Sequence, residues 1–568
     1  MIFGHNGFTS SAPSLLLLGL GLAPLAAQEP PSSLFVDRVD VQVVNIEAFV
    51  FDKKGSRVTG LTRGDFEVLE DGRPVELTNF FAVDRDRRVE SSPEPGRTTD
   101  KQSSPAETPP GVQHPISLVV YIDHFNLRPS SRNRAIRNIE GFLQGFMGNG
   151  DRVMLVGAFL GAEAIQPFTG DWVTVASSLN KMRKAATHRQ VDEAALLRTI
   201  KSMTLNDDPR DAYQHLRSYV ESAQSELRRS TGLLRDTVRS LSGLPGRKSL
   251  MYVSEGLPQR PGEGLYAQIQ EIFDSRQLRT AGLHASSDAL GEDQTSLFEE
   301  IVREANAHQV TFYTLDASGP TTMGLSAATG GAAIVGNAGP TAFAHMRKAN
   351  LQEPLSELAE ATGGTAILGT FNFDKVLDRL ADDFDSFYSL GYSPADIDSN
   401  RYRRIEVRVK PPGLVVRHRS GYVAKTAAEL MADRTLSSLL LDVDKNPLEI
   451  QVDFGSWEKS GRNKFRLPVL VRVPFSKVTL VPNGPSYSGR LRLYVAVKDQ
   501  DGAVSDVQQS PYPIKVPAAR LEEALDKEIG HLMTLVARGG PARIAVGVWD
   551  ELSGIDSIVH QELLLGEE

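Results

Sequence analysis

The stretch ISLVVYIDHFNL, residues 116–127, decides the fold of this chain. Its first seven residues are apolar except for one serine, and the run ends at Asp123. A short, nearly continuous apolar run is typical of a strand buried on both faces of a parallel sheet. Ser130 or Ser131 is expected to cap the next helix, because apolar residues then recur at helical spacing through Met147. The stretch therefore predicts the first strand–loop–helix unit of an α/β domain.

Four further apolar runs repeat this arrangement downstream. They are RVMLVGAF, KSLMYVSEG, VTFYTLDA and GTAILG, and segments with helical periodicity separate them. The longest such segment, residues 212–241, carries Leu216, Val220 and Leu227 on one face. Strands that alternate with helices predict a Rossmann-like α/β fold, a parallel sheet with helices on both faces, over residues 115–386.

Short β-rich segments flank this α/β domain. Residues 34–83 alternate apolar and polar side chains and contain the hairpin signal Asp71-Gly72, so they predict a small β-sandwich-like module. Residues 84–114 are rich in Pro, Ser, Glu and Arg, which indicates a disordered linker. Residues 387–424 hold strand patterns around a Pro-Pro-Gly turn and are expected to form a β-hairpin extension.

The C-terminal residues 435–568 predict a second β-rich domain. Alternating strand patterns occur in FRLPVLVRV, GRLRLYVAVKDQDG and ARIAVGVWDELSG, and they favour a β-sandwich. One amphipathic helix is expected within this domain, at residues 518–537.

Residues 1–27 have the features of a secretory signal peptide. The apolar run SLLLLGLGLA precedes the small residues of PLAAQE, and cleavage is expected near Ala27. No other run reaches 18 apolar residues, so no transmembrane segment is expected. The sequence has 0 cysteines, which excludes disulfides and thiolate chemistry. A secreted or periplasmic protein is therefore predicted.

Charge limits the classes of partner. The net charge of -9 makes nucleic acid an unexpected partner for the whole molecule. Six basic residues do cluster in one predicted strand pair: Arg403, Arg404, Arg408, Lys410, Arg417 and Arg419. We interpret them as the solvated face of that pair, with binding of an anionic glycan or lipid head group as the alternative.

Two carboxylates mark a candidate site. Asp123 ends the first predicted strand, and Glu255 ends the strand pattern SLMYVSEG. In open α/β sheets, ligands bind beyond the carboxyl ends of the strands, where the loops converge. Asp123 and Glu255 are therefore expected to face the same crevice.

The segments SLVVYID and GLPGRKSLMYVSEG resemble the von Willebrand factor type A fold. Together with VTGLTRGDFEVLEDGRPVELTNFF upstream and FYSLGYSP and YRRIEVRVKPPGLVVRHRSGYVA downstream, they are similar to the VWFA-related acidobacterial domain family of exported bacterial proteins. The resemblance covers roughly residues 35–424 and leaves the C-terminal domain outside. It implies protein binding, adhesion or assembly on the cell envelope, with a protein or cell-surface partner of unknown identity.

The resemblance also implies a metal site, and this sequence departs from its pattern. Domains of this kind hold Mg²⁺ through an Asp-x-Ser-x-Ser motif, a threonine from a following loop and an aspartate from a later strand end. Asp123 matches the first aspartate, but Phe125 and Leu127 stand at the two serine positions. Thr187 is the candidate threonine, and Glu255 stands at the later aspartate. The expectation is a degenerate site with no cofactor, or weak Mg²⁺ binding at most.

Three functions follow from these observations. The first is an exported binding module, largely independent of metal, with the Gly- and Ala-rich residues 319–350 as a surface loop that contacts the partner. The second is an exported hydrolase with Asp123 and Glu255 as paired carboxylates. The third is a purely structural spacer of the envelope. No His-Glu-x-x-His pattern or Gly-x-Ser-x-Gly elbow occurs, so an enzyme is not expected.

Overall fold

The computed structural model describes most of the chain from residue 43 onward. The predicted signal peptide, nearly all of the predicted linker, Thr187 and residues 321–339 lie outside the described residues. The described ranges are 43–84, 116–147, 151–158, 162–185, 193–284, 288–289, 291–320, 340–370, 373–394, 401–441 and 443–566. Within these ranges, no helix has the length and apolar character needed to cross a membrane.

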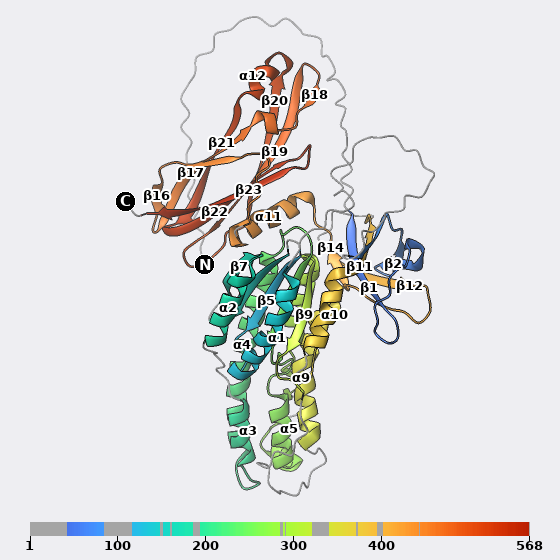
Figure 1. The fold of residues 1–568 in the computed structure, drawn as a ribbon. Helices are drawn as coiled ribbons and strands as arrows, with labels where there is room; N and C mark the ends of the chain where they lie inside the picture. The colour runs from blue at the N-terminus through green and yellow to red at the C-terminus, as the bar shows by residue number, and fades with distance from the viewer. Residues whose placement is uncertain are drawn as a thin grey trace, which may run out of the picture. The chain divides into compact units, whose positions relative to one another are not determined.

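A six-stranded sheet forms the centre of the α/β domain (Figure 1). Its strand order is β10-β9-β8-β5-β6-β7, and every neighbouring pair is parallel except β6 with β7. The strands are β5 (Ser117–Asp123), β6 (Arg152–Ala158), β7 (Ala162–Thr169), β8 (Lys248–Ser254), β9 (Val310–Asp316) and β10 (Ala366–Ile367). The five predicted strands are therefore present, and the antiparallel edge strand β7 was not predicted.

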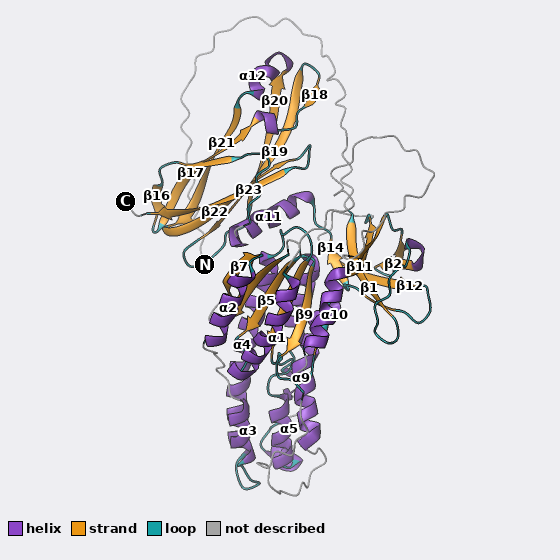
Figure 2. Ribbon diagram, viewed as in Figure 1, coloured by secondary structure: helices purple, strands orange, loops and turns teal. Residues whose placement is uncertain are grey.

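Helices cover both faces of this sheet, as the secondary-structure colouring makes visible (Figure 2). The helices of this domain are α1 (Pro129–Phe146), α2 (Trp172–Lys184), α3 (Glu193–Lys201), α4 (Pro209–Ser240), α5 (Glu263–Ile272), α6 (Ser275–Thr280), α8 (Thr295–Ala307), α9 (Pro340–Ala361) and α10 (Asp374–Asp385). Side chains of β5 alternate between two cores. Leu118 and Ile122 pack with α1, α2 and α10, whereas Val119 and Tyr121 pack with α4, α8 and α9.

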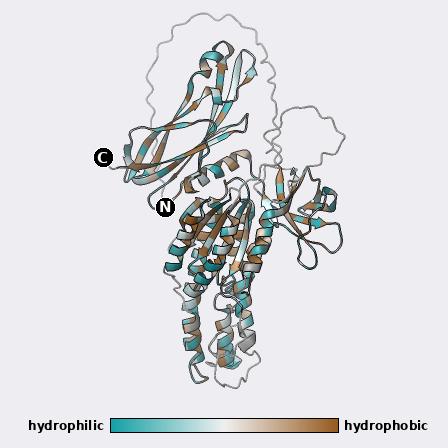
Figure 3. Cartoon of the chain, viewed as in Figure 1, coloured by the Kyte–Doolittle hydropathy of each residue, from teal (hydrophilic) through white to brown (hydrophobic). Residues whose placement is uncertain are grey.

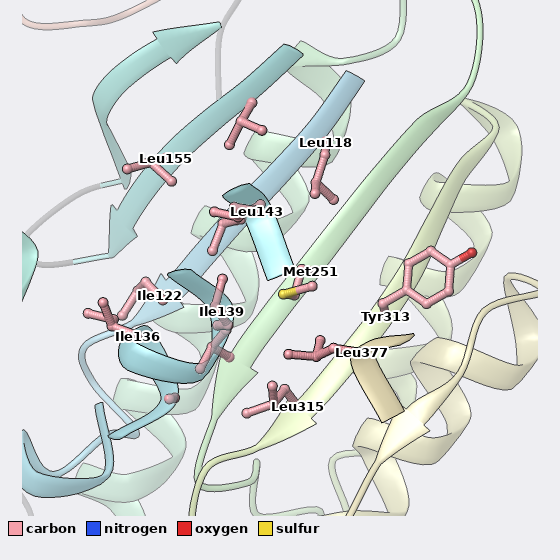
Figure 4. Close-up of a cluster of buried hydrophobic side chains, with 14 of the residues drawn as sticks. Leu118, Ile122, Ile136, Ile139, Leu143, Leu155, Met251, Tyr313, Leu315 and Leu377 are labelled. Atoms are coloured by element: carbon pink, nitrogen blue, oxygen red, sulfur yellow. The ribbon is translucent and has the colours of Figure 1, made fainter. Parts of the chain in front are cut away.

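The first of these cores is shown in close-up (Figure 4), where Ile136, Ile139 and Leu143 of α1 lie over the strands. The hydropathy colouring places hydrophobic residues along the strands of this sheet (Figure 3). A mixed α/β architecture with a largely parallel sheet is therefore observed.

Two local expectations for this domain are wrong. Helix α1 begins at Pro129 with Arg128 as its N-cap, so Ser130 and Ser131 lie inside the first turn and cap nothing. Proline favours the first helical position because its fixed φ suits the helix and its missing N–H has no partner there. Residues 340–350 of the loop expected at residues 319–350 belong to helix α9 instead.

Strands that precede the α/β domain in the sequence and strands that follow it form one β-sandwich. One sheet has the order β13-β1-β11-β4 and the other β14-β12-β2-β3. The strands are β1 (Val44–Phe51), β2 (Phe66–Glu70), β3 (Arg73–Val75), β4 (Asn79–Asp84), β11 (Ser386–Tyr392), β12 (Tyr402–Val409), β13 (Val415–Arg417) and β14 (Gly421–Val423).

This pairing corrects the division into a module at residues 34–83 and a separate hairpin at 387–424. Strand β11 lies between β1 and β4, and β12 lies between β2 and β14. Apolar residues of both segments share one core, including Ile46, Leu390 and Ile405. The α/β domain is therefore inserted into the sandwich, between β4 and β11.

The predicted basic face of this sandwich is only partly solvated. Arg403 is buried and donates to Glu70 at 2.7 Å, and Glu70 also accepts from Tyr392 at 2.6 Å and Tyr422 at 2.7 Å. Arg408 is exposed and pairs with its neighbour Glu406. The basic residues thus serve internal ion pairs as well as the surface.

Residues after the sandwich form helix α11 (Ala427–Leu441) and two further β-sheets. One sheet contains β15, β16, β17 and β21, and the other contains β18, β19, β20, β22 and β23. The strands are β15 (Gln451–Phe454), β16 (Glu458–Gly461), β17 (Lys464–Pro474), β18 (Val481–Asn483), β19 (Ser486–Lys498), β20 (Gln508–Pro517), β21 (Glu528–Arg538), β22 (Gly540–Asp550) and β23 (Asp556–Leu565). Both sheets contribute to one apolar core, which is the arrangement of a sandwich.

The prediction of a helix at residues 518–537 is wrong for most of these residues. A 3-10 turn and the five-residue helix α12 (Leu521–Leu525) occupy its start, and β21 occupies the rest. All eleven residues of β21 pair with β17, and Ile529, Leu535 and Ala537 face the sandwich core. Pairing and burial therefore override the local helical pattern.

A partly buried ion network around Glu304 joins α4 to α8. Glu304 accepts from Nε of Arg239 at 2.5 Å and contacts Nε2 of His308 at 3.0 Å. Burial alone would raise the pKa of Glu304, but the hydrogen bonds and charges of His308 and Arg239 outweigh it and lower the pKa to about 2. The ionised carboxylate therefore stabilises the folded state at neutral pH.

We expect this contribution to disappear as the pH falls from about 4.5 towards about 2, because the unfolded carboxyl binds its proton first. Urea unfolding of the wild type and Glu304→Gln at several pH values between 7 and 2 measures it. The difference in unfolding free energy should be largest at pH 7 and shrink as the pH falls. Glu300→Gln, in a more exposed pair with Arg235, is the control and should change little. A constant difference for Glu304→Gln across the range would contradict the assignment.

Candidate functional site

Acidic residues stand at the carboxyl ends of three neighbouring strands. Asp123 is the last residue of β5, Glu255 follows β8 directly, and Asp316 is the last residue of β9. Because β5, β8 and β9 are adjacent and parallel, their carboxyl ends meet at one edge of the sheet. Asp123 and Glu255 therefore occupy the edge where the sequence predicts a site.

Protein donors surround the carboxylate of Asp123, which is fully buried. Oδ1 accepts from the backbone N–H groups of Phe125 at 3.1 Å and Asn126 at 3.4 Å. Oδ2 accepts from Nδ2 of Asn126 at 2.8 Å, from the hydroxyl of Ser230 at 3.3 Å, and from the hydroxyl of Tyr252. Five donors thus fill the acceptor positions of this carboxylate.

Burial raises the pKa of Asp123, and the hydrogen bonds from Tyr252 and Asn126 oppose that effect. A buried carboxylate that lacks a cation needs such donors to offset its desolvation. A metal ion, in contrast, needs free lone pairs on its ligands. The surroundings of Asp123 therefore suit a carboxylate held by the protein itself better than a metal ligand.

The two residues at the serine positions are core residues. Phe125 is buried in the cluster of α4 and α8, and Leu127 is buried in the cluster of α1 and α2. Their side chains leave the site on opposite faces of the sheet. The two positions at which the Asp-x-Ser-x-Ser pattern would have serines therefore hold packing residues.

Glu255 is held by a guanidinium group. Nε of Arg128 lies 2.9 Å from both carboxylate oxygens of Glu255, and the backbone N–H of Arg128 lies 3.4 Å from Oε1. The Glu255 side chain is 8% exposed, whereas the Arg128 side chain is 61% exposed. The positive charge at this edge of the sheet is thus built into the chain and reaches solvent.

The segment between Asp123 and Arg128 links the two carboxylates. Asn126 donates its side-chain amide to Asp123, and its backbone carbonyl accepts from the N–H of Glu255 at 2.9 Å. Arg128 then completes the segment on the carboxylate of Glu255. One short loop therefore sets the position of both acidic residues.

Arg128 and Asp316 also belong to this edge, although the sequence did not predict them as members of the site. Asp316 is buried and accepts from the N–H of Ser318 at 2.8 Å and from Nε2 of Gln352 at 2.5 Å. Its position at the end of the strand pattern VTFYTLDA was a usable signal, because strand ends carry the site in such sheets. Nothing in the sequence pattern pairs Arg128 with Glu255, since 127 residues separate them.

Helix α9 fixes the loop that follows β8. Backbone N–H groups of Leu257 and Gln259 donate to carbonyls of α9 at 3.1 Å each. Gly256 has a φ of 113°, and a Cβ there would lie 2.6 Å from Cβ of Leu351. The loop beside Arg128 is therefore held rigidly against the domain, which suits a preformed contact surface.

No group of three or more His, Cys, Asp or Glu side chains that could hold a metal ion occurs within the part of the chain that the structure describes. Thr187, the candidate threonine, lies outside the described residues. Asp123 and Glu255 are therefore the two members of the predicted metal site that can be placed, and each is engaged by protein donors.

A cavity of about 630 Å³ lies away from Asp123 and Glu255. Its walls include Phe51 and Val416 from the first sandwich and Tyr313, Ile367 and Leu380 from the α/β domain. Neither Asp123 nor Glu255 lines it. The two carboxylates therefore do not share this cavity.

The fold and this edge define a mixed α/β protein whose strand-end carboxylates accept hydrogen bonds from its own backbone and side chains. No model of a known protein family matches the chain, and no curated protein matches it.

Solved structures show distant likeness. An aerotolerance-related membrane protein from Bacteroides fragilis NCTC 9343 has 12% identity over 47% of this chain and 98% of its own, with a TM-score of 0.22. BatB from Bacteroides thetaiotaomicron has 11% identity over 47% of this chain and 97% of its own, with a TM-score of 0.20. The pilus adhesin SpaC from Lactobacillus rhamnosus GG, in an open conformation, has 8% identity over 80% of this chain and 52% of its own, with a TM-score of 0.25. Values this low assign neither a fold family nor a function.

Proposed function

We propose that the protein is an exported binding protein of the cell envelope, and that its α/β domain is of the von Willebrand factor A type. The strand order, the single antiparallel edge strand β7 and the helices on both faces of the sheet support that fold. Binding uses the loops at the carboxyl ends of β5 and β8 and needs no divalent cation. Export rests on the signal-like residues 1–27 of the sequence.

The position of Arg128 carries this proposal. Its Nε donates to the carboxylate of Glu255, while its two terminal nitrogens form no hydrogen bond with any described residue. In metal-dependent domains of this type, the ion receives an acidic side chain of the partner. Here the exposed guanidinium offers that acidic group a fixed, forked pair of donors. The binding chemistry is thus recognition of a carboxylate by Arg128.

The geometry favours binding over hydrolysis. A general acid or base must come within hydrogen-bond reach of the substrate. Asp123 is fully buried, and Glu255 is 8% exposed and paired with Arg128, so neither is presented to a substrate. The exposed arginine also favours a binding protein over a structural spacer. A spacer would not need an exposed Arg128 that is held in place by Glu255.

Binding of the purified protein to envelope fragments of the source organism tests the proposal, with and without EDTA. We expect Arg128→Ala to weaken binding about tenfold, because a charge-assisted hydrogen bond contributes about 1.5–3 kcal/mol. Arg210→Ala is the matched control, since that side chain is also 61% exposed and ion-paired. EDTA should leave binding unchanged.

Thermal melting in millimolar Mg²⁺, Mn²⁺ or Ca²⁺ provides the second arm of this test. A folded state that holds an ion must melt at a higher temperature when the ion is present. We expect no rise for the wild type. A rise that Asp123→Ala abolishes, or binding that EDTA abolishes, would contradict the metal-independent mechanism. Equal binding by Arg128→Ala and the wild type would contradict the role of Arg128.

A further inference from the structure

Strand β21 is an unprotected edge of the C-terminal sandwich. Among the described residues it pairs with β17 only, and that pairing runs without a register shift from Glu528 to Arg538. Its outward side chains include Leu532, which is 67% exposed, and Val536, which is 57% exposed. A long, flat edge strand with exposed apolar side chains is a template for pairing with another strand.

The neighbouring edge shows how this protein blocks such pairing. Strand β20 is a rim strand of the facing sheet, and contact between the rings of Tyr512 and His531, at 5.1 Å, places it beside β21. Three of its ten residues are prolines, Pro511, Pro513 and Pro517. Proline has no backbone N–H, and it prevents further strand addition. Strand β21 contains neither proline nor lysine, so one edge is blocked and the adjacent one is open.

We propose that β21 is a self-association surface, to which β21 of a second copy of this chain adds in antiparallel orientation. The two four-stranded sheets would then continue into each other across the interface. This inference is independent of the role of Arg128 and of the partner proposed above.

The register of this pairing follows from geometry. Opposite residues in an antiparallel pair point to the same face, so the two residue numbers must have an even sum when both strands are the same. The register with full overlap of the eleven residues centres on Met533. It places Glu528 opposite Arg538 at both ends of the interface, and Leu532 opposite Thr534 beside the centre.

The charges complement each other in this register. Opposite charges that face each other across two strands stabilise the pair, whereas like charges destabilise it. In the single chain, Arg538 lies 3.2 Å from Asp499 and Glu528 lies 3.7 Å from Arg472. The Arg538 side chain is 58% exposed and the Glu528 side chain is 41% exposed, so both can also reach the charges of a second copy.

Sedimentation velocity over a range of protein concentrations tests the proposal on the full chain. We expect the wild type to dimerise reversibly and Leu532→Lys to raise the dissociation constant at least tenfold. Leu564→Lys is the control, because Leu564 is 50% exposed on β23, away from the β21 edge. Circular dichroism and melting temperature show whether each variant is folded. A wild type that stays monomeric, or equal effects of the two lysine variants, would overturn the proposal.

Charge reversal distinguishes this register from any other association. Glu528→Arg alone and Arg538→Glu alone should each be monomeric, because like charges then face each other. An equimolar mixture of these two variants should dimerise, because each chain supplies the charge that the other lacks. The double variant with both substitutions should also dimerise. Failure of both the mixture and the double variant to dimerise, with each variant folded, would overturn the antiparallel self-pairing.

Discussion

Replacing Asp383 with alanine is expected to lower the free energy of unfolding by about 3–5 kcal/mol. Asp383 lies in the last turn of α10, and its side chain is 4% exposed. Its carboxylate accepts from Nη2 of Arg57 at 2.6 Å and from Nη2 of Arg417. Both arginines belong to the first sandwich, so Asp383 ties that sandwich to the α/β domain.

The magnitude follows from the charges that would remain. Arg57 and Arg417 both lie over the rings of Phe49 and Phe51, so neither guanidinium can turn into water without leaving an aromatic contact. Burial lowers the pKa of Arg57, and Asp383 opposes that effect. Removing one partner of a buried ion pair leaves an uncompensated charge, which costs far more than the pair contributes.

Urea unfolding measures this effect, with Glu406→Ala as its control. Glu406 also pairs with an arginine, but both side chains are about half exposed, so the change should stay within about 1 kcal/mol. Asp383→Ala should also expose the junction of the two domains to proteolysis before the α/β core unfolds. A loss below about 1 kcal/mol for Asp383→Ala would show that the arginines find other partners.

Replacing Gly364 with alanine is expected to lower the free energy of unfolding by about 3 kcal/mol, or to prevent folding. Gly364 lies in the buried turn between α9 and β10. A Cβ there would lie 1.8 Å from the backbone oxygen of Phe312 and 2.8 Å from its carbonyl carbon. Phe312 belongs to β9, an inner strand of the sheet, so neither the turn nor the strand can move without disturbing the sheet.

Gly141→Ala provides a control of opposite sign. Gly141 lies exposed inside α1, and a Cβ there meets nothing within 4 Å. Alanine should therefore stabilise the protein by about 0.5–1 kcal/mol through better helix propensity. The melting temperatures of the two variants should move in opposite directions. A neutral Gly364→Ala variant would mean that the turn adjusts freely.

The presence of five strands in the α/β domain could be predicted because each of them has a local apolar pattern. The runs that end at Asp123 and Glu255 are mainly apolar. Burial on both faces of a parallel sheet favours that pattern. The edge strand β7 was not predicted because its sequence, AEAIQPFT, mixes polar and apolar residues. The apolar pattern of a strand follows from its burial, and an edge strand is less buried than an inner strand.

Pairing across long stretches of chain could not be predicted. The strands of residues 44–84 and 386–423 show the same alternation, but nothing in either pattern selects the register of Val44 with Tyr392. The prediction of a helix at the residues of β21 was wrong for a related reason. The segment around Leu525, Ile529 and Leu532 has helical spacing, and eleven pairs with β17 decide its structure instead.

At the candidate site, the sequence predicted the positions of the carboxylates but not what satisfies them. Asp123 and Glu255 do stand at neighbouring strand ends. The donors come from Tyr252 on β8, from Ser230 on α4 and from Arg128 before α1, and such contacts depend on the tertiary fold. The absence of serine from the two expected ligand positions was visible in Phe125 and Leu127, whereas the pairing of Arg128 with Glu255 was not visible in the sequence.

The insertion of the α/β domain into the first sandwich sets an order for making this protein. Strands β1 to β4 leave the ribosome about 300 residues before β11, the strand that lies between β1 and β4. At about 5–20 residues per second, the early strands wait roughly 15–60 seconds with their edges open. A chain truncated before Ser386 therefore keeps these edges exposed permanently. Such fragments should be the aggregation-prone products of incomplete synthesis, even where their α/β domain is already folded.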